Sequence, residues 1–323
     1  MNRVAARLGQ LAVCSAVLAV PLLGSAFYTE LATKALVLSI FAMSLDLLVG
    51  FSGLVSFGHA AYFGVAAYAL ALLTPRLEGA SLWIALPASI GAAGLAALAI
   101  GFFALRTRGV YFIMVTLAFA QMVYYVFHDT GIGGGSDGIY VNFRPDASLF
   151  GFKPFDLGNA RHLYYFVAAL ALATYLLLAR TLRSAFGCAL MGIRSNEHRM
   201  QSLGYRTFHY KLAAFTLAGG LAGLAGFLYA VLYGFVTPEL MAWHQSGDVL
   251  LMVILGGIGT LTGPVMGALA LVGLHEAFSS LTRHWQLAMG TVIVLAVIAL
   301  PGGLARLPAR VGHALAGIRN RNG

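Results

Sequence analysis

The chain has 323 residues, of which 60% are hydrophobic and 10% are charged, and its mean hydropathy is +0.84. Soluble domains carry about 25% charged residues and disordered chains need low hydrophobicity, so the composition excludes both classes. The net charge of +9 does not indicate nucleic-acid binding, because the basic residues are scattered singly between apolar runs. The sequence therefore predicts an all-α, polytopic integral membrane helical bundle.

Ten apolar runs are candidates for membrane-spanning helices, which need roughly 20 residues each. We place them at 8–28, 35–50, 59–75, 82–104, 110–128, 162–179, 212–236, 246–258, 262–282 and 286–301. Glycine-rich stretches without charges join the second run to the third and the eighth to the ninth. Because such stretches can contain broken or re-entrant helices, we expect eight to ten spans in a single domain over residues 1–323.

The basic residues predict the orientation of these spans. With ten spans and a cytoplasmic N-terminus, fourteen of the twenty Lys and Arg residues face the cytoplasm, as the positive-inside rule requires. Both termini are then cytoplasmic, with a long external loop at about 129–161 and a cytoplasmic loop at about 180–211. Arg3, Arg7 and a run ending at 24–26 also resemble a cleavable signal peptide. Removal of that span, however, would place the cation-rich loop 180–211 outside.

The stretch from Gly50 to Gly64 has the features of a broken helix, because four glycines weaken it and polar side chains interrupt an apolar run. Unwound backbone at bilayer depth is tolerated only where it is buried in protein or lines a wet cavity. Either a substrate path or close helix packing through small residues explains the pattern. The candidate path residues here are Asp46, Ser52, Gly53, Ser56, Gly58 and His59. A structural hydrogen bond is the alternative for Asp46, which is an acid inside a span.

A second glycine-rich stretch, 256–267, resembles the first and hints at duplicated halves. Its candidate path residues are Gly256, Gly257, Gly259 and Thr262. Two further acids, Asp248 and Glu276, lie inside spans. By contrast, Gly219, Gly223 and Gly226 follow helical spacings, which predicts helix packing and no substrate role.

In the cytoplasmic loop, residues 192–205 predict a short amphipathic helix that is capped by Ser195 or Asn196 and ended by Gly204. Glu197 then lies at the positive end of this helix. A helix of mixed charge beneath the membrane suits docking into a groove of a soluble partner, and contact with anionic lipid is the alternative.

No set of residues predicts an enzyme, a cofactor or a metal site. The nine histidines form no His-x-x-x-His or His-Glu-x-x-His pair. The three lysines, Lys34, Lys153 and Lys211, do not follow glycine, so the chain contains no P-loop. If this chain moves a solute at the expense of ATP, another subunit must bind and hydrolyse the ATP.

Five ordered stretches resemble permease subunits of branched-chain amino-acid ABC importers, of the longer of the two permease types. They are LLVGFSGLVSFGHAAYFG at 47–64, RGVYFIMVTLAFAQ at 108–121, GGGSDG at 133–138, MGIRSNEHRMQSLGY at 191–205 and LGGIGTLTGP at 255–264. The resemblance covers about residues 35–300. It implies a multi-pass subunit of a bacterial inner membrane that imports leucine, isoleucine or valine.

The resemblance also implies partners: a second permease subunit, two ATP-binding cassette ATPases, an extracytoplasmic substrate-binding protein, and membrane lipid. The coupling helix that enters the ATPase groove would lie at 194–204, with Arg194, Asn196, Glu197, Arg199, Leu203 and Gly204 as coupling residues. Two positions depart from the family pattern. Asp46 stands where relatives often have asparagine, and Arg199-Met200-Gln201 stands where many permeases have small alanines.

Two alternatives to this function remain open from the sequence. Related permeases move urea, short amides or sugars, and no residue here reads an aliphatic side chain. A proton-driven secondary transporter that uses Asp46 and Asp248 is the more distant alternative.

Overall fold

The computed structural model describes Pro21 and residues 25–75, 79–148, 155–281, 283–300 and 302–306. The predicted first span, at 8–28, lies outside these residues except for Pro21 and its last four positions. The predicted cytoplasmic placement of the two termini also falls on residues that the structure does not describe.

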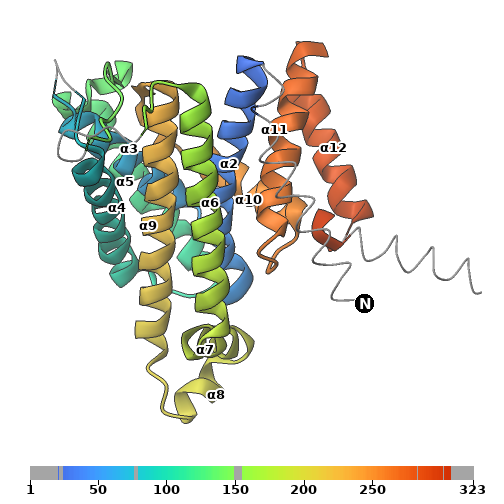
Figure 1. Ribbon diagram of the computed structural model, residues 1–323. Coiled ribbons are helices and arrows are strands. Elements are labelled where there is room, and N and C mark those ends of the chain that lie inside the picture. Colours follow the sequence, from blue (N-terminus) through green and yellow to red (C-terminus); the bar gives the residue numbers. More distant parts are fainter. Residues whose placement is uncertain are drawn as a thin grey trace, which may run out of the picture.

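The described part of the chain is mostly helical (Figure 1). Its principal helices are α2 (Ala26–Asp46), α3 (His59–Leu73), α4 (Leu82–Ala104), α5 (Val110–Asp129), α6 (Ala160–Arg183), α7 (Ala185–Ser195), α8 (Glu197–Ser202), α9 (Thr207–Tyr233), α10 (Trp243–Gly256), α11 (Gly263–Leu281) and α12 (Trp285–Ala299). Six of the described helices are long and apolar enough to cross a membrane: α2 with its continuation to Ser52, α4, α5, α6, α9 and α11. The predicted polytopic helical bundle is therefore confirmed.

Helices α2 and α9 form the centre of the bundle, and most of their residues are buried. The glycines of α9 allow neighbouring helices to approach closely. A Cβ atom at Gly219 or Gly223 would overlap alanine side chains of α4, and one at Gly226 would overlap the carbonyl oxygen of Phe63 in α3. The predicted packing role of these glycines is confirmed.

Helices α3 and α10 are half-helices that begin at the same place inside the bundle. They contain 15 and 14 residues, so they are about 22 Å and 21 Å long, shorter than the roughly 30 Å hydrocarbon core. The Ser246 hydroxyl near the start of α10 accepts a hydrogen bond from the Ala60 N–H at the start of α3, at 2.9 Å. From this shared point α10 runs toward the end of the bundle that carries α7 and α8, and α3 runs toward the opposite end (Figure 1).

A two-stranded ribbon at that opposite end departs from the predicted all-α fold. Strand β1 (Ile139–Tyr140) pairs antiparallel with β2 (Phe235–Val236), and it follows the short 3-10 turns η3 (Gly131–Gly133) and η4 (Gly135–Asp137). The ribbon ties the predicted external loop to the end of α9. From β2 the chain passes through η5 (Pro238–Met241) into α10, and a last turn, η6 (Leu304–Arg306), follows α12.

Candidate functional site

The first helix break lies between α2 and α3. After α2 the chain widens into a π-helical turn, η2 (Leu47–Ser52), and Gly53 then adopts a left-handed conformation at φ 72°. The segment 54–58 is not helical and leads to the N-terminus of α3. Its backbone polar groups find partners, since the Phe57 N–H donates to the Thr116 hydroxyl and the Gly58 N–H donates to the Ser56 hydroxyl. The predicted break is present, and its backbone is held by protein contacts.

The second helix break lies between α10 and α11. Helix α10 ends at Gly256, and Gly257 and Gly259 have φ angles of 120° and 74°. A Cβ atom at Gly256 would overlap the carbonyl oxygen of Gly263, the first residue of α11. Only glycine fits these positions, so the break depends on the glycines that predicted it.

The two breaks meet at one point, although they lie about 200 residues apart in the chain. The Oδ1 atom of Asp46 accepts a hydrogen bond from the Gly259 N–H at 2.8 Å. A side chain at Gly50 would collide with both Asp46 and the Gly259 backbone. The guanidinium of Arg194, the next-to-last residue of α7, donates to the Gly50 carbonyl oxygen and attracts the Asp46 carboxylate. We call Asp46, Gly50, Arg194 and Gly259 the junction.

The junction gives Asp46 a structural partner. Its side chain is fully buried, whereas Gly259 is half-buried, so the hydrogen bond between them is partly shielded from water. The other carboxylate oxygen, Oδ2, makes no hydrogen bond within the described residues. Since asparagine also carries one acceptor oxygen, it could make the same bond to Gly259, which explains how either residue fits at this position.

His59 lies in a separate contact, deep in the bundle. Its Nε2 atom is 2.8 Å from the Ser44 hydroxyl of α2, and its ring stacks on Phe41 at 5.5 Å between centroids. The side chain is fully buried, and its Nδ1 atom has no hydrogen-bond partner in the described part of the chain. In this arrangement His59 fixes α3 against α2.

Helix α8 forms a corner with α7 and α9, at the bottom of the view in Figure 1. Asn196 caps it by accepting a hydrogen bond from the Arg199 N–H at 2.9 Å, and Gly204 follows it at φ 86°. Both features agree with the sequence prediction. The predicted stretch 192–205 is not one helix, however, because its first residues complete α7.

Glu197 ties α8 to α9. Its Oε1 atom accepts hydrogen bonds from Lys211 at 2.7 Å and from Thr207 at 3.0 Å. Burial alone would raise the pKa of Glu197, but the hydrogen bond and charge of Lys211 and the hydrogen bond of Thr207 outweigh it. The pKa therefore lies below its ordinary value of 4.5, and the carboxylate is ionised at neutral pH.

Met200 and Gln201, which the sequence analysis singled out together with Arg199, also hold this corner. Met200 packs on Gly192 of α7. A Cβ atom added at Gly192 would lie only 2.8 Å from the Met200 sulfur. The Gln201 amide donates to the Thr207 hydroxyl at 3.1 Å. Arg199 and Leu203 are exposed, so α8 presents a charge and an apolar side chain outward.

The structure brings together only part of the predicted site. Asp46, Gly259 and Arg194 meet, whereas Ser52 bonds back to the Leu47 carbonyl and Thr262 is exposed. The contact residues that the sequence analysis missed are Ser44, Thr207, Lys211 and Ser246. All four are polar residues within or beside apolar runs, and this pattern could have marked them as contact residues.

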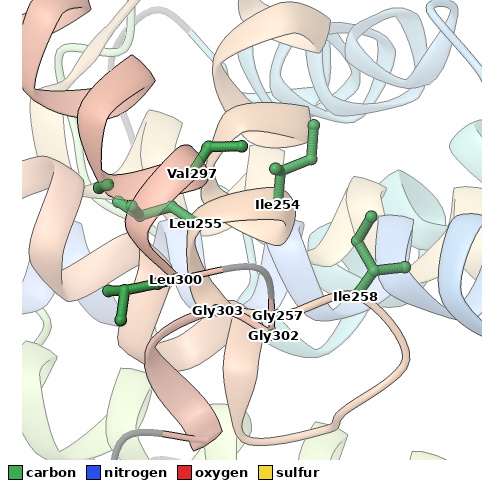
Figure 2. A pocket seen from close by; sticks show the side chains of 9 residues that line it. Ile254, Leu255, Gly257, Ile258, Val297, Leu300, Gly302 and Gly303 are labelled. Carbon is green, nitrogen blue, oxygen red and sulfur yellow. The ribbon is translucent and has the colours of Figure 1, made fainter.

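Two cavities lie at opposite ends of the bundle. One of about 160 Å³ lies between the second break and the end of α12, and Figure 2 shows that its labelled lining residues are glycines and aliphatic side chains. Its volume is below the 300–1,000 Å³ usual for ligand sites, and no charged or hydroxyl side chain lines it. The other, of about 510 Å³, lies at the opposite end of the bundle between the end of α3, Gly131–Gly134 and β1. In the described residues, no group of His, Cys, Asp and Glu side chains is arranged to hold a metal ion.

Comparison with known proteins decides the class of this membrane bundle. A family described as "Branched-chain amino acid transport system / permease component" matches residues 27–300. The chain belongs to this family. The permease is 31% identical over 303 residues to the high-affinity branched-chain amino acid transport system permease protein LivM of Escherichia coli, covering 88% of this chain and 71% of LivM. LivM of Salmonella typhimurium matches equally well.

A second kind of relative is more distant. The autoinducer 2 import system permease protein LsrC of Klebsiella pneumoniae is 30% identical over 185 residues, covering 55% of this permease and 53% of LsrC. No solved structure matches the chain. The family membership makes this chain a transport subunit, not an enzyme, with no cofactor of its own.

Proposed function

We propose that the permease forms one half of the translocation path of an ATP-driven importer for leucine, isoleucine and valine in a bacterial inner membrane. Membership of the branched-chain amino acid permease family carries this proposal. The other parts of the importer would be a second permease subunit, two ATP-binding cassette ATPases and an extracytoplasmic binding protein. The ATPases supply the energy, because the chain has no P-loop.

The end of the bundle that carries α7 and α8 would face the cytoplasm. Its arginines support this orientation by the positive-inside rule. They are Arg106, Arg108, Arg180, Arg183, Arg194, Arg199 and Arg206. The 510 Å³ cavity and the β ribbon would then face outward, where a binding protein delivers the amino acid.

Helix α8 would dock on an ATPase through its exposed face. Arg199 and Leu203 offer the ATPase a charge and an apolar contact. Movement of α8 passes to α9 through the ion pair of Glu197 with Lys211, and movement of α7 passes to both helix breaks through Arg194. This chain of contacts joins the proposed docking surface to the proposed path.

The junction would close the cytoplasmic end of the path in this structure. The bond between Asp46 and Gly259 holds the two breaks together, so the breaks cannot separate while it persists. ATP-driven movement of α7 would pull Arg194 against Gly50 and shift η2 relative to the second break. The glycines at both breaks provide the freedom for this change.

Uptake measurements in proteoliposomes test the function. The permease is reconstituted with its partner permease and the ATPases, and uptake of radiolabelled leucine is measured with a loaded binding protein outside. We expect uptake that requires both ATP and the ATPase subunits. Uptake that persists without the ATPases and collapses with the proton gradient would identify a secondary transporter. Uptake of urea, short amides or sugars in place of leucine would contradict the proposed solute.

A further inference from the structure

Helices α10 and α11 carry a polar cluster of His244, Asp248 and His275. Asp248 and His244 are one turn apart on α10, and both side chains are exposed. His244 and the half-buried His275 of α11 are close enough to act on the Asp248 carboxylate electrostatically. The second half of α10, from Val249 to Gly256, is entirely apolar.

The positions of the three residues along α10 and α11 give their distances from the second break. His244 is 12 residues before Gly256, and His275 is 12 residues after Gly263, so each lies about 18 Å along its helix from the second break. Asp248 is about 12 Å from the same break by the same rise per residue. The second break is itself bonded to Asp46 near the end of α2. With the second break at the cytoplasmic end of the path, as proposed above, these distances put all three side chains within the roughly 30 Å hydrocarbon core.

The Asp248 carboxylate is exposed on an otherwise mostly apolar helix. Ionisable side chains inside the membrane are costly where they face lipid, so they face a water-filled cavity or a polar partner. No lysine or arginine of the described chain forms an ion pair with Asp248. The helix on which it lies contacts α2, α3, α5 and α11, and therefore stands next to both breaks of the proposed path. Asp248 thus offers a carboxylate beside that path that no lysine or arginine of the described residues neutralises.

An amino acid that crosses the membrane as a zwitterion carries an α-ammonium group that is charged at neutral pH. A carboxylate within the path would stabilise this positive charge. An aliphatic side chain gains nothing from a carboxylate, whereas an ammonium group forms a charge-assisted hydrogen bond with one. We propose that Asp248 binds the α-ammonium group of the transported amino acid as it passes α10. This inference rests on the proposed function, since it takes the solute to be an amino acid and the breaks to line its path.

The test compares Asp248→Asn with a matched control, Glu276→Gln, in the reconstituted importer. Asparagine keeps the size of the side chain and removes the charge. Glu276 is a half-buried acid next to His275 on α11, so its replacement removes the same charge from the same region without altering α10. Leucine uptake and ATP hydrolysis are measured in the same vesicles, with a leucine-loaded binding protein outside.

We expect Asp248→Asn to lower the leucine transported per ATP hydrolysed about tenfold, Asp248→Glu to restore part of it, and Glu276→Gln to match the wild type. An unchanged ratio in Asp248→Asn overturns the inference, as does an equal fall in Glu276→Gln. Loss of the partner permease from purified Asp248→Asn would assign Asp248 to a subunit interface and also overturn it. Failure of the wild-type importer to move leucine would instead refute the proposed function, so the two failures are distinguishable.

Discussion

The hydrogen bond between Asp46 and Gly259 gives a quantitative prediction for the junction. Replacement of Asp46 by alanine removes the acceptor and leaves the Gly259 N–H without its partner at a contact that is buried on the Asp46 side. An unsatisfied buried donor costs about 1–3 kcal/mol, which is roughly 5- to 150-fold in an equilibrium constant. Replacement by asparagine keeps an acceptor oxygen at the same position, so we expect it to cost less than about 1 kcal/mol.

Two assays measure this difference. Thermal unfolding of the purified permease pair should show Asp46→Ala destabilised relative to both Asp46→Asn and the wild type. ATP-driven leucine uptake should fall several-fold in Asp46→Ala and stay within about twofold of wild type in Asp46→Asn. If both variants match the wild type in both assays, the bond to Gly259 does not hold the breaks together. If both variants fail equally, the charge that faces Arg194 matters more than the acceptor.

Two further predictions concern the α8–α9 corner and the packing of α9. Glu197→Gln should lower the free energy of unfolding by about 1 kcal/mol at pH 7, as expected for a partly buried ion pair. Because the pKa of Glu197 in the folded protein lies below its ordinary value of 4.5, its stabilising charge is fully present above about pH 5 and is lost as the pH falls through the lowered pKa, so the two proteins should converge in stability only below that pKa. A gap that persists there would contradict this cause. Gly226→Ala should lower the melting temperature by the equivalent of about 1–3 kcal/mol, because its Cβ atom would overlap the Phe63 carbonyl. Gly220→Ala on the same helix is the control, since its Cβ atom meets only Ile90 at 3.6 Å, and an equal loss in both variants would refute the packing argument.

The sequence predicted the features of this fold that depend on local chemistry. Glycine density identified both helix breaks, helical spacing identified the packing glycines of α9, and a capping residue identified the start of α8. Each of these follows from residues that are close together in the chain. The two-residue strands β1 and β2 were not predicted, because two residues show no periodicity and their pairing joins segments about 100 residues apart.

The functional contacts depended on long-range packing and were predicted only in part. Asp46 and Gly259 were both candidate residues, but nothing in the spacing of two residues 213 positions apart indicates that they bond. Arg194 was expected only at the docking surface for an ATPase. The structure adds a contact that was not predicted, between its guanidinium and the Gly50 carbonyl oxygen, because α7 packs against η2. The same limit applies to Ser246 and Ala60, which meet across 186 positions.

Arg194 provides the most direct test of the proposed coupling between the ATPases and the helix breaks. The measurement is the stimulation of ATP hydrolysis by a leucine-loaded binding protein in the reconstituted importer. It is compared between Arg194→Ala and Arg183→Ala, where Arg183 is an exposed arginine at the end of α6. Loss of a charge-assisted hydrogen bond should reduce the stimulation about tenfold in Arg194→Ala and leave it unchanged in Arg183→Ala. Wild-type stimulation in Arg194→Ala would show that the signal between the two sides of the membrane does not pass through the junction.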